Sequence, residues 1–367
     1  ESAFDRDAES YVVRPAPSRR PKVELVDLRH EPAGTVLSRI LVGAMQEAVE
    51  RKTGVLLFLN RKGYARTLVC RDCGWVPRCP SCAVALAYGR EAGLLACRYC
   101  GRTDAMLQSC PVCYSTRLTT VGDGTERAEV EARRLFPQAT VTRVDRDALH
   151  RADAARQTWE GIRSGAWDIL IGTQALFQRG PLPRRGVVGI MQADSGLHIP
   201  DFRAAERTYQ LLDEAVAVAR PYSEGGRVIV QTRLPAHHTV EAVLSADPQR
   251  FYDEELAARR LLNYPPACHL AALSVSGKDQ QEVETAAKRW RSCLEQSVGT
   301  EVPPSILGPV PAMGKRPKGL HRFQILVKGG DHDGLCRLIQ KSVSQMEQEY
   351  RKKRVKFVVD IDPLELS

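Results

Sequence analysis

Short apolar runs alternate with longer amphipathic stretches along the first two thirds of the chain. The apolar runs predict strands at Lys22–Leu28, Val55–Asn60, Thr140–Val144, Ile169–Gly172, Val187–Met191 and Val228–Gln231. The amphipathic stretches predict helices at Leu37–Arg51, Thr125–Phe136, Ala152–Ser164 and Phe202–Arg220. Strands that are apolar on both faces and alternate with helices are typical of a parallel sheet with helices on either side. The pattern therefore predicts an α/β domain.

The pattern changes after about Ala267. Strands are predicted at "LAALSVSG", "RFQILVKG" and "VKFVVDIDP". Amphipathic helices are predicted at "DQQEVETAAKRWRSCLEQSV" and "GLCRLIQKSVSQMEQEYRKK". The order strand, helix, strand, helix, strand predicts a small α+β domain with its helices on one face of the sheet.

Length and composition are those of an ordinary globular protein with a basic surface. The 367 residues, 43 % apolar and 26 % charged, suffice for two or three domains with their own cores. Lys and Arg number 53 against 44 Asp and Glu, which leaves a net charge of +9. This excess favours a polyanionic partner.

The sequence contains no apolar run of 18 residues, and its charged N-terminal residues hold no signal-peptide core. We therefore expect a soluble, cytoplasmic protein that makes no membrane contact. The chain begins at Glu1 with sequence that is typical of the middle of a domain. For this reason we also expect it to be part of a longer protein.

Eight of the eleven cysteines lie close together and predict two structural metal sites. They form the C-x2-C pairs Cys70/Cys73, Cys79/Cys82, Cys97/Cys100 and Cys110/Cys113. A C-x2-C turn points two thiolates at one ion, and two such turns complete a closed tetrahedral Zn²⁺ site without room for substrate water. The eight ligands therefore predict two Zn²⁺ ions. We expect Cys268, Cys293 and Cys336 to be buried apolar side chains.

Other cysteine chemistries fit the sequence less well. Disulfides require an oxidising compartment, which the missing signal peptide argues against. An iron–sulfur cluster also takes four cysteines, but the Pro and Gly residues in "CRDCG", "CPSC", "CRYCG" and "CPVC" are typical of zinc ribbons.

Four turns allow three pairings, and the position of the module favours one of them. The module interrupts the α/β pattern after Val55–Asn60, so a nested pairing holds its two ends together. We predict one ion on Cys70, Cys73, Cys110 and Cys113, and the other on Cys79, Cys82, Cys97 and Cys100. Metal binding would supply most of the folding free energy of a segment this poor in large apolar residues.

Several motifs occur in an order that identifies a family. They are "FLNRKGYARTLVCRDCGW", the four cysteine turns, "VGDGTER", "VDRD", "ILIGTQ", "DFRAAER", "YPP", "LGPVPA", "RFQILVKG" and "DIDP". In order and spacing they resemble the second helicase lobe and C-terminal domain of the PriA family of bacterial replication restart proteins. The resemblance covers nearly the whole chain after about residue 22. It implies a RecA-like parallel-sheet lobe that contains the eight-cysteine insert.

The resemblance also implies partners and domain limits. The implied partners are branched or forked DNA, primosome proteins and single-stranded-DNA-binding protein. We predict helicase lobe 2 in residues 1–69 and 114–266, the zinc-binding insert in residues 70–113, and the α+β domain in residues 267–367.

Two motor motifs of the family are altered in this chain, which also contains no G-x-x-x-x-G-K-[ST] phosphate loop. Where working family members resemble Q-V-A-G-R-A-G-R, "EAVAVARP" places Val218 and Pro221 at the arginine positions. Where they resemble "GTQMLAKGH", "GTQALFQRG" places Gln178 and Arg179 at the Lys-Gly pair. Such arginines reach the transferred phosphoryl group. We therefore predict a pseudo-helicase without ATPase activity.

Two alternatives to the pseudo-helicase stay open at this point. A small realignment that makes Arg220 functional would give an active ATP-dependent 3′→5′ DNA helicase. A zinc-ribbon interaction scaffold without DNA affinity is the third function class. If the chain binds DNA, we expect the contacts in one basic loop cluster, at Lys315, Arg316, Lys318 and Arg322.

The remaining charged and aromatic positions receive structural interpretations. The cluster Arg351 to Lys356 is expected to be a solvated helix end. Arg203 and Glu206 are three residues apart and are expected to form a local pair on one helix face. His150 and His198 are isolated in the sequence and receive no role.

Overall fold

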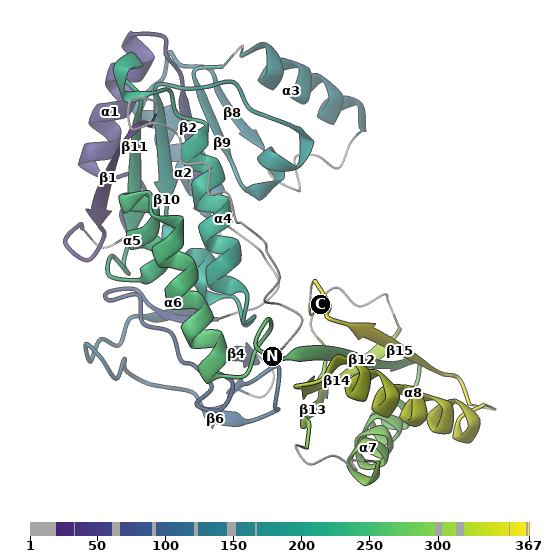
Figure 1. The fold of residues 1–367 in the computed structure, drawn as a ribbon. Coiled ribbons are helices and arrows are strands. Elements are labelled where there is room, and N and C mark those ends of the chain that lie inside the picture. The colour runs from purple at the N-terminus through teal and green to yellow at the C-terminus, as the bar shows by residue number, and fades with distance from the viewer. Residues whose placement is uncertain are drawn as a thin grey trace.

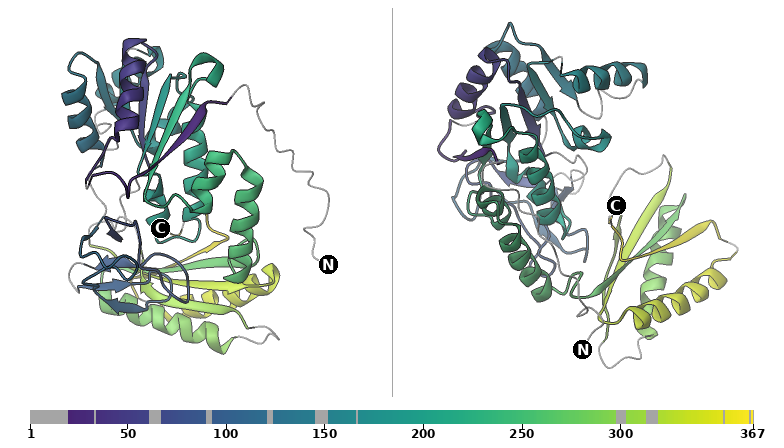
Figure 2. Two further views of the ribbon diagram at one scale, coloured as in Figure 1. Left: turned by 90° about the vertical axis from the view of Figure 1, so that its left-hand side faces the viewer. Right: turned by 45° about the horizontal axis from the view of Figure 1, so that its top comes forward.

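The computed structural model describes residues 20–32, 34–60, 67–89, 93–120, 124–144, 152–165, 167–297, 303–312, 319–351, 353–364 and 366. Figure 1 shows three regions: a lobe built on a parallel sheet, a cysteine-rich insert at one end of it, and a separate C-terminal sheet with two helices. Figure 2 shows that the C-terminal region meets the rest of the chain near the insert and the end of the last lobe helix.

Six parallel strands form the lobe sheet, in the order β1-β11-β10-β2-β9-β8. Their bounds are Lys22–Asp27 (β1), Val55–Leu59 (β2), Val141–Val144 (β8), Ile169–Gly172 (β9), Val187–Met191 (β10) and Arg227–Thr232 (β11). Each predicted strand is present, with ends within one residue of the prediction. The central strands β2, β9 and β10 are buried along their whole length, which is why the apolar runs located them well.

Helices cover both faces of this sheet, as the α/β pattern predicts. On one face the core includes Leu41 of α1 (Arg39–Glu50) and Ala132 of α2 (Gly124–Leu135). On the other face it joins α3 (Ala152–Ser164), α4 (Ala204–Ala217), α5 (His238–Ser245) and α6 (Pro248–Leu261). None of the helices in the described ranges combines the length and apolarity that a membrane span needs.

Short helices were missed by the periodicity. The 3-10 helices η2 (Gln174–Arg179), η3 (Ala193–His198) and η4 (Tyr222–Glu224) are only one or two turns long and follow or precede strands. Helix α6 carries a usable signal, because Asp247 caps its first turn and Pro248 follows.

The cysteine-rich insert closes on itself. Its outer strands β3 (Leu68–Cys70) and β7 (Leu118–Thr120) pair antiparallel, so the two ends of the insert lie side by side. Between them, β4 (Ala87–Gly89), β5 (Leu94–Ala96) and β6 (Thr103–Ala105) form a three-stranded sheet.

The C-terminal region is a four-stranded antiparallel sheet with both helices packed against one face. The order is β13-β14-β12-β15, from β12 (His269–Gly277), β13 (Ser305–Pro311), β14 (His321–Gly329) and β15 (Val355–Ile361). The helices α7 (Gln280–Gln296) and α8 (His332–Glu349) share a core with the sheet that includes Trp290.

The strand β13 corrects the predicted order, which becomes strand, helix, strand, strand, helix, strand. Its sequence "SILGPVP" contains two prolines and a register shift between Leu307 and Val310. Proline lacks the N–H that a central strand needs, and this strand lies at the edge of the sheet. The two prolines argued against a strand in the sequence, but an edge strand tolerates them.

Candidate metal centres and the joint around them

The eight cysteines come together as two groups of four, paired as the nested arrangement predicts. Cys70, Cys73, Cys110 and Cys113 form the outer site, and Cys79, Cys82, Cys97 and Cys100 form the inner site. Within each site the four sulfur atoms lie within 4.8 Å of one another.

The sulfur geometry fits zinc. In the outer site the Sγ atoms of Cys70 and Cys113 are 3.5 Å apart and those of Cys73 and Cys110 are 3.6 Å apart. In the inner site the Sγ atoms of Cys79 and Cys100 are 3.7 Å apart. Zn–S bonds of about 2.3 Å in a tetrahedron place neighbouring sulfurs about 3.8 Å apart. The two groups therefore fit two structural Zn²⁺ ions, each with four protein ligands and no open position.

One backbone turn is repeated at all four cysteine pairs. In each, the first cysteine accepts at its carbonyl oxygen an N–H bond from the residue four positions later, namely Gly74, Ala83, Gly101 or Tyr114. Each of these four residues has a positive φ. This turn directs both thiolates to the same side, which explains how the sequence makes each half-site locally.

The two sites differ in their surroundings. At the inner site Cys79, Cys82 and Cys97 are buried, whereas Cys113 of the outer site is exposed. The side chain of Tyr114, next to the outer site, is 80 % exposed. The inner site belongs to a hydrophobic cluster that contains residues from the insert, the lobe and the C-terminal sheet.

Tyr264 lies at the centre of that cluster. Its hydroxyl donates to the carbonyl oxygen of Cys82 at 2.9 Å. Its ring stacks on Phe202 of the lobe, with centroids 4.7 Å apart, and meets Tyr99 of the insert edge-on at 6.2 Å. Tyr264 belongs to the "YPP" motif, and its contacts with both the insert and the lobe were not predicted.

Tyr99 links the inner site to the start of α4. Its hydroxyl accepts the backbone N–H of Phe202 at 3.1 Å and lies 3.5 Å from a carboxylate oxygen of Asp201. Full burial and the nearby Asp201 carboxylate raise the pKa of Tyr99 well above its usual range. The phenol is therefore a neutral structural group.

Lys328 of the C-terminal sheet lies against the same hydrophobic cluster. Its Nζ donates to the carbonyl oxygen of Leu262 at 3.1 Å and lies 3.5 Å from the ring centroid of Tyr264. Burial lowers the pKa of Lys328. Leu270 and Leu326 of the sheet and Leu366 near the chain end are buried in the same cluster.

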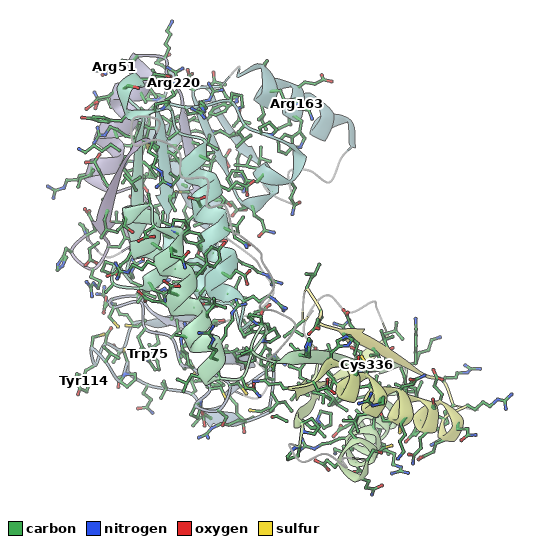
Figure 3. The ribbon with its side chains drawn as sticks, viewed as in Figure 1. Arg51, Trp75, Tyr114, Arg163, Arg220 and Cys336 are labelled. Atoms are coloured by element: carbon green, nitrogen blue, oxygen red, sulfur yellow. The ribbon has the colours of Figure 1, made fainter. Side chains whose placement is uncertain are left out.

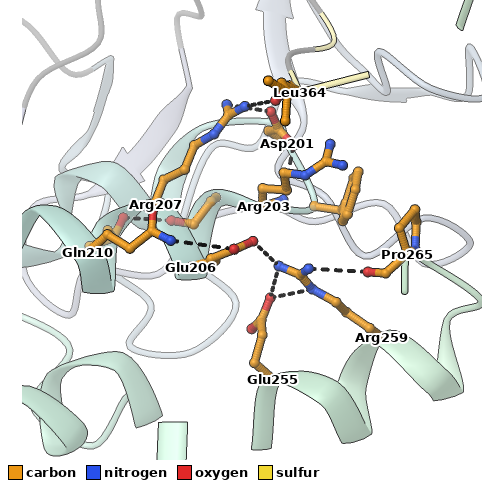
Figure 4. A network of polar contacts seen from close by, with 12 residues as sticks. Asp201, Arg203, Glu206, Arg207, Gln210, Glu255, Arg259, Pro265 and Leu364 are labelled. Atoms are coloured by element: carbon orange, nitrogen blue, oxygen red, sulfur yellow. Dashed lines mark hydrogen bonds and ion pairs between the residues drawn. The ribbon is translucent and has the colours of Figure 1, made fainter. Parts of the chain in front are cut away.

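A polar network lies beside this cluster and is drawn in Figure 4. Arg259 of α6 contacts Glu206 at 2.7 Å and Glu255 at 2.9 Å, and donates to the carbonyl oxygen of Pro265 at 3.2 Å. Arg207 of α4 contacts Asp201 at 2.9 Å.

The same network corrects the expected pair of Arg203 and Glu206. The carboxylate of Glu206 pairs with Arg259 of another helix. The guanidinium of Arg203 lies over the ring of Phe202, 4.3 Å from its centroid. Arg203 is the N-cap residue of α4, so it precedes the regular helix in which residues three apart share a face.

His198 has a structural role that the sequence analysis did not assign. It is buried, and its Nε2 lies 3.2 Å from Oδ2 of Asp194. Burial alone raises the pKa of Asp194, but hydrogen bonds with His198, Thr232 and the Arg233 N–H lower it to about 2. The i, i+4 spacing of Asp194 and His198 was the available signal. His150 lies outside the described residues.

Asp194 and His198 hold the lobe to the outer part of the insert. The carbonyl oxygen of His198 accepts from the hydroxyl of Thr67, just before β3. The Nε of Arg233 donates to the carbonyl oxygen of Arg71 at 2.7 Å.

Three of the four predicted DNA contacts, Lys315, Arg316 and Lys318, lie outside the described residues. Arg322 is the second residue of β14, and its carbonyl oxygen accepts the N–H of Ala312 at 2.9 Å. The loop cluster therefore stays a prediction.

Comparison with known proteins agrees with this architecture. Residues 260–364 match the family model of the primosomal protein N C-terminal domain. The chain is 34 % identical over 346 residues to replication restart protein PriA of Bacillus subtilis (strain 168), which covers 94 % of this chain and 43 % of that protein. The chain matches the C-terminal portion of PriA. PriA of Treponema pallidum (strain Nichols) is 36 % identical, over 94 % of this chain and 51 % of that protein.

The PriA relatives are longer than this chain, which spans about half of their length. PriA of Haemophilus influenzae is 32 % identical, over 94 % of this chain and 46 % of its own length. Among solved structures, S. cerevisiae Dbp5 bound to RNA and ADP BeF3 is 11 % identical and covers 67 % of this chain and 45 % of that one. The TM-score of this match is 0.30.

Proposed function

We propose that the chain is the C-terminal portion of a replication restart protein that binds branched or forked DNA and takes part in primosome assembly without ATPase activity. The similarity to PriA and the net charge of +9 support DNA binding. The residues at the two motor positions, Val218 and Pro221, carry the proposed loss of ATPase activity.

Both motor positions hold groups that offer no donor to a phosphate. Val218 is the C-cap residue of α4, and its side chain is buried in the lobe core at 7 % exposure. Pro221 is the cap of η4 and has neither a side-chain donor nor an N–H. A catalytic arginine contributes about 10³- to 10⁵-fold to such a reaction, so these two residues favour an inactive lobe.

Arg220 is the observation in favour of an active ATP-dependent 3′→5′ DNA helicase. It lies beside Pro221, and within the described part of the chain its guanidinium has no ion-pair partner. ATP hydrolysis by the full-length protein, measured with and without forked DNA, decides between the two. We expect no DNA-stimulated turnover. Turnover that Arg220→Ala abolishes and Arg260→Ala leaves intact would establish the helicase instead.

The exposed end of the insert favours a third function, an interaction scaffold that does not bind DNA. Val112 and Tyr114 beside the outer site are 60 % and 80 % exposed and would supply apolar contact area to a protein partner. Binding of forked DNA over a salt series separates this function from the first. We expect binding that weakens steeply with salt, and a chain that fails to bind at low salt would be a scaffold.

The loop cluster is the proposed DNA contact in the C-terminal region. Replacing Lys315, Arg316 and Lys318 together by Ala is expected to weaken binding equally across DNA sequences and to flatten its salt dependence. Unchanged binding of forked DNA would exclude the loop as a contact. Primosome proteins and single-stranded-DNA-binding protein are the proposed protein partners.

A further inference from the structure

Basic side chains gather at the edge of the parallel sheet where its strands begin. Arg51 and Lys52 precede β2, Arg184 and Arg185 precede β10, and Arg220 precedes β11. Because these three strands are neighbours and parallel, their amino ends meet at one edge. We name these five residues the amino-edge patch. The function proposed above uses none of them as a DNA contact.

Backbone hydrogen bonds hold the three loops of the patch side by side. The N–H of Arg220 donates to the carbonyl oxygen of Arg185 at 2.8 Å, and the N–H of Arg185 donates to that of Val218 at 2.9 Å. The N–H of Gly186 donates to the carbonyl oxygen of Thr53 at 3.0 Å. The cations are therefore brought together by the backbone of the sheet and its loops. Pairing between their side chains is not required.

The guanidinium of Arg185 is fixed within the patch. It lies 3.9 Å from the ring centroid of Trp167. A Cβ atom at Gly54 would come within 2.7 Å of this side chain and one at Gly165 within 2.9 Å, so both glycines leave room for it. Burial and the neighbouring Arg220 lower the pKa of Arg185. The Nε and Nη2 atoms of Arg185 are buried without a hydrogen-bond partner.

Three other arginines on the lobe surface, by contrast, have acidic partners. Arg133 and Arg143 each lie 2.8 Å from a carboxylate oxygen of Glu129. Arg250 lies 3.1 Å from Glu254. Within the described ranges, no side chain of the amino-edge patch has such an ion pair. The patch therefore keeps its positive charge available to a ligand.

Acidic residues of the same edge do not neutralise the patch. The loop before β9 contains Asp168, whose carboxylate accepts the N–H of Thr140 at 2.8 Å. The loop before β11 contains Glu224, which is exposed. Glu50, directly before Arg51, is also exposed, and five cations against these three carboxylates leave an excess of two positive charges at the edge.

We propose that the amino-edge patch binds backbone phosphates of DNA. This inference rests on the proposed function, because it assigns a second contact surface to a protein that binds branched DNA. Guanidinium groups donate paired hydrogen bonds to phosphate oxygens. Binding of unpaired cations to DNA also releases counterions from the phosphates, and this release favours the complex. A bound phosphate would also offset the electrostatic repulsion between the neighbouring side chains of Arg185 and Arg220.

The position of the patch suits a branched ligand. Arg233, which follows β11 at its carboxyl end, contacts the insert through Arg71, so the insert lies at the other edge of the sheet. Figure 3 shows Arg51 and Arg220 at one end of the lobe, and Trp75 and Tyr114 of the insert at the opposite end. One duplex arm can therefore lie at the amino-edge patch while another reaches the C-terminal region.

The test replaces three exposed or half-exposed members of the patch in the full chain: Arg51→Gln, Arg184→Gln and Arg220→Gln. The matched control removes three exposed cations elsewhere: Arg260→Gln, Lys278→Gln and Lys341→Gln. Thermal unfolding checks that each variant folds. Affinity for forked DNA is measured at several salt concentrations, and binding of ATP is measured in parallel.

We expect the patch variant to bind forked DNA about tenfold more weakly or worse, with a salt slope shallower by about 3, and the control to match the original chain. Equal affinities of patch variant and control would overturn the inference. Loss of ATP binding with unchanged DNA binding would also overturn it, because the phosphate would then belong to a nucleotide. Failure of the unsubstituted chain to bind forks would instead refute the proposed function.

A second measurement tests the branched geometry. One duplex arm of the fork is shortened step by step, and the ratio of affinities between original chain and patch variant is followed. We expect the ratio to fall towards one when that arm no longer reaches the patch. A ratio that does not depend on the length of either arm would contradict a contact with a second arm.

Discussion

The two zinc sites have the same local turns and different attachments to the molecule. The inner site lies in an apolar and aromatic cluster with Tyr264, Phe202 and Leu326. The outer site is tied to the lobe by polar contacts, from Thr67 to His198 and from Arg233 to Arg71. The C-x2-C turn therefore determines the metal site, whereas the residues around it determine which parts of the chain the metal holds.

The largest expected difference follows removal of one ligand from each site. Cys100→Ser and Cys73→Ser are matched, because both cysteines are half-buried. Each variant is expected to keep one zinc ion, by elemental analysis. Because only the inner site is part of the interdomain cluster, only Cys100→Ser is expected to increase the radius of gyration in small-angle scattering. Equal expansion of both variants would contradict the comparison.

Truncation of an aromatic residue at each site is expected to have a smaller effect. Tyr264 is 2 % exposed, so Tyr264→Ala should lower the free energy of unfolding by about 3 to 5 kcal/mol through lost packing. Tyr114 is 80 % exposed, and Tyr114→Ala should change the free energy of unfolding by less than about 0.5 kcal/mol. Urea unfolding of both variants, with zinc content checked, measures the contrast. Tyr264→Phe, which removes the bond to Cys82, should cost about 1 kcal/mol.

An effect smaller than that of Tyr264→Ala is expected at the polar attachment of the outer site. The pKa of Asp194 is lowered to about 2, so its carboxylate contributes stability above about pH 4, which is lost as the pH falls towards 2. Asp194→Asn should therefore lower the free energy of unfolding at pH 7 by about 2 kcal/mol. Asp253→Asn on the surface of α6 is the control. Equal values for the two variants would show that the Asp194 network does not stabilise the lobe.

The sequence predicted those features that depend on neighbours along the chain. Strands β2, β9 and β10 are apolar at every position, because both faces are buried, and their limits could be read directly. The nested cysteine pairing followed from the position of the insert, whose end strands β3 and β7 indeed pair. In each case the property that shapes the structure, burial of both strand faces or position along the chain, is visible in the sequence itself.

Features that depend on distant partners were missed. The role of Tyr264 arises from Phe202, Tyr99 and Cys82, which no periodicity brings together. The amino-edge patch likewise joins loops that are far apart in sequence and adjacent only through the strand order. The expected pair of Arg203 and Glu206 was wrong because α4 begins at Ala204, two residues after the predicted start at Phe202.

Nesting of the two sites has a consequence for the order of metal uptake. Cys82 and Cys97 are separated by 14 residues, whereas Cys73 and Cys110 are separated by 36. Closing the longer loop first costs about 1 kcal/mol more in chain entropy. Once the inner ion is bound, the unconstrained chain between the outer turns shrinks to two short connectors. A nascent chain is therefore expected to load its first zinc at the centre of the module and its second at the rim.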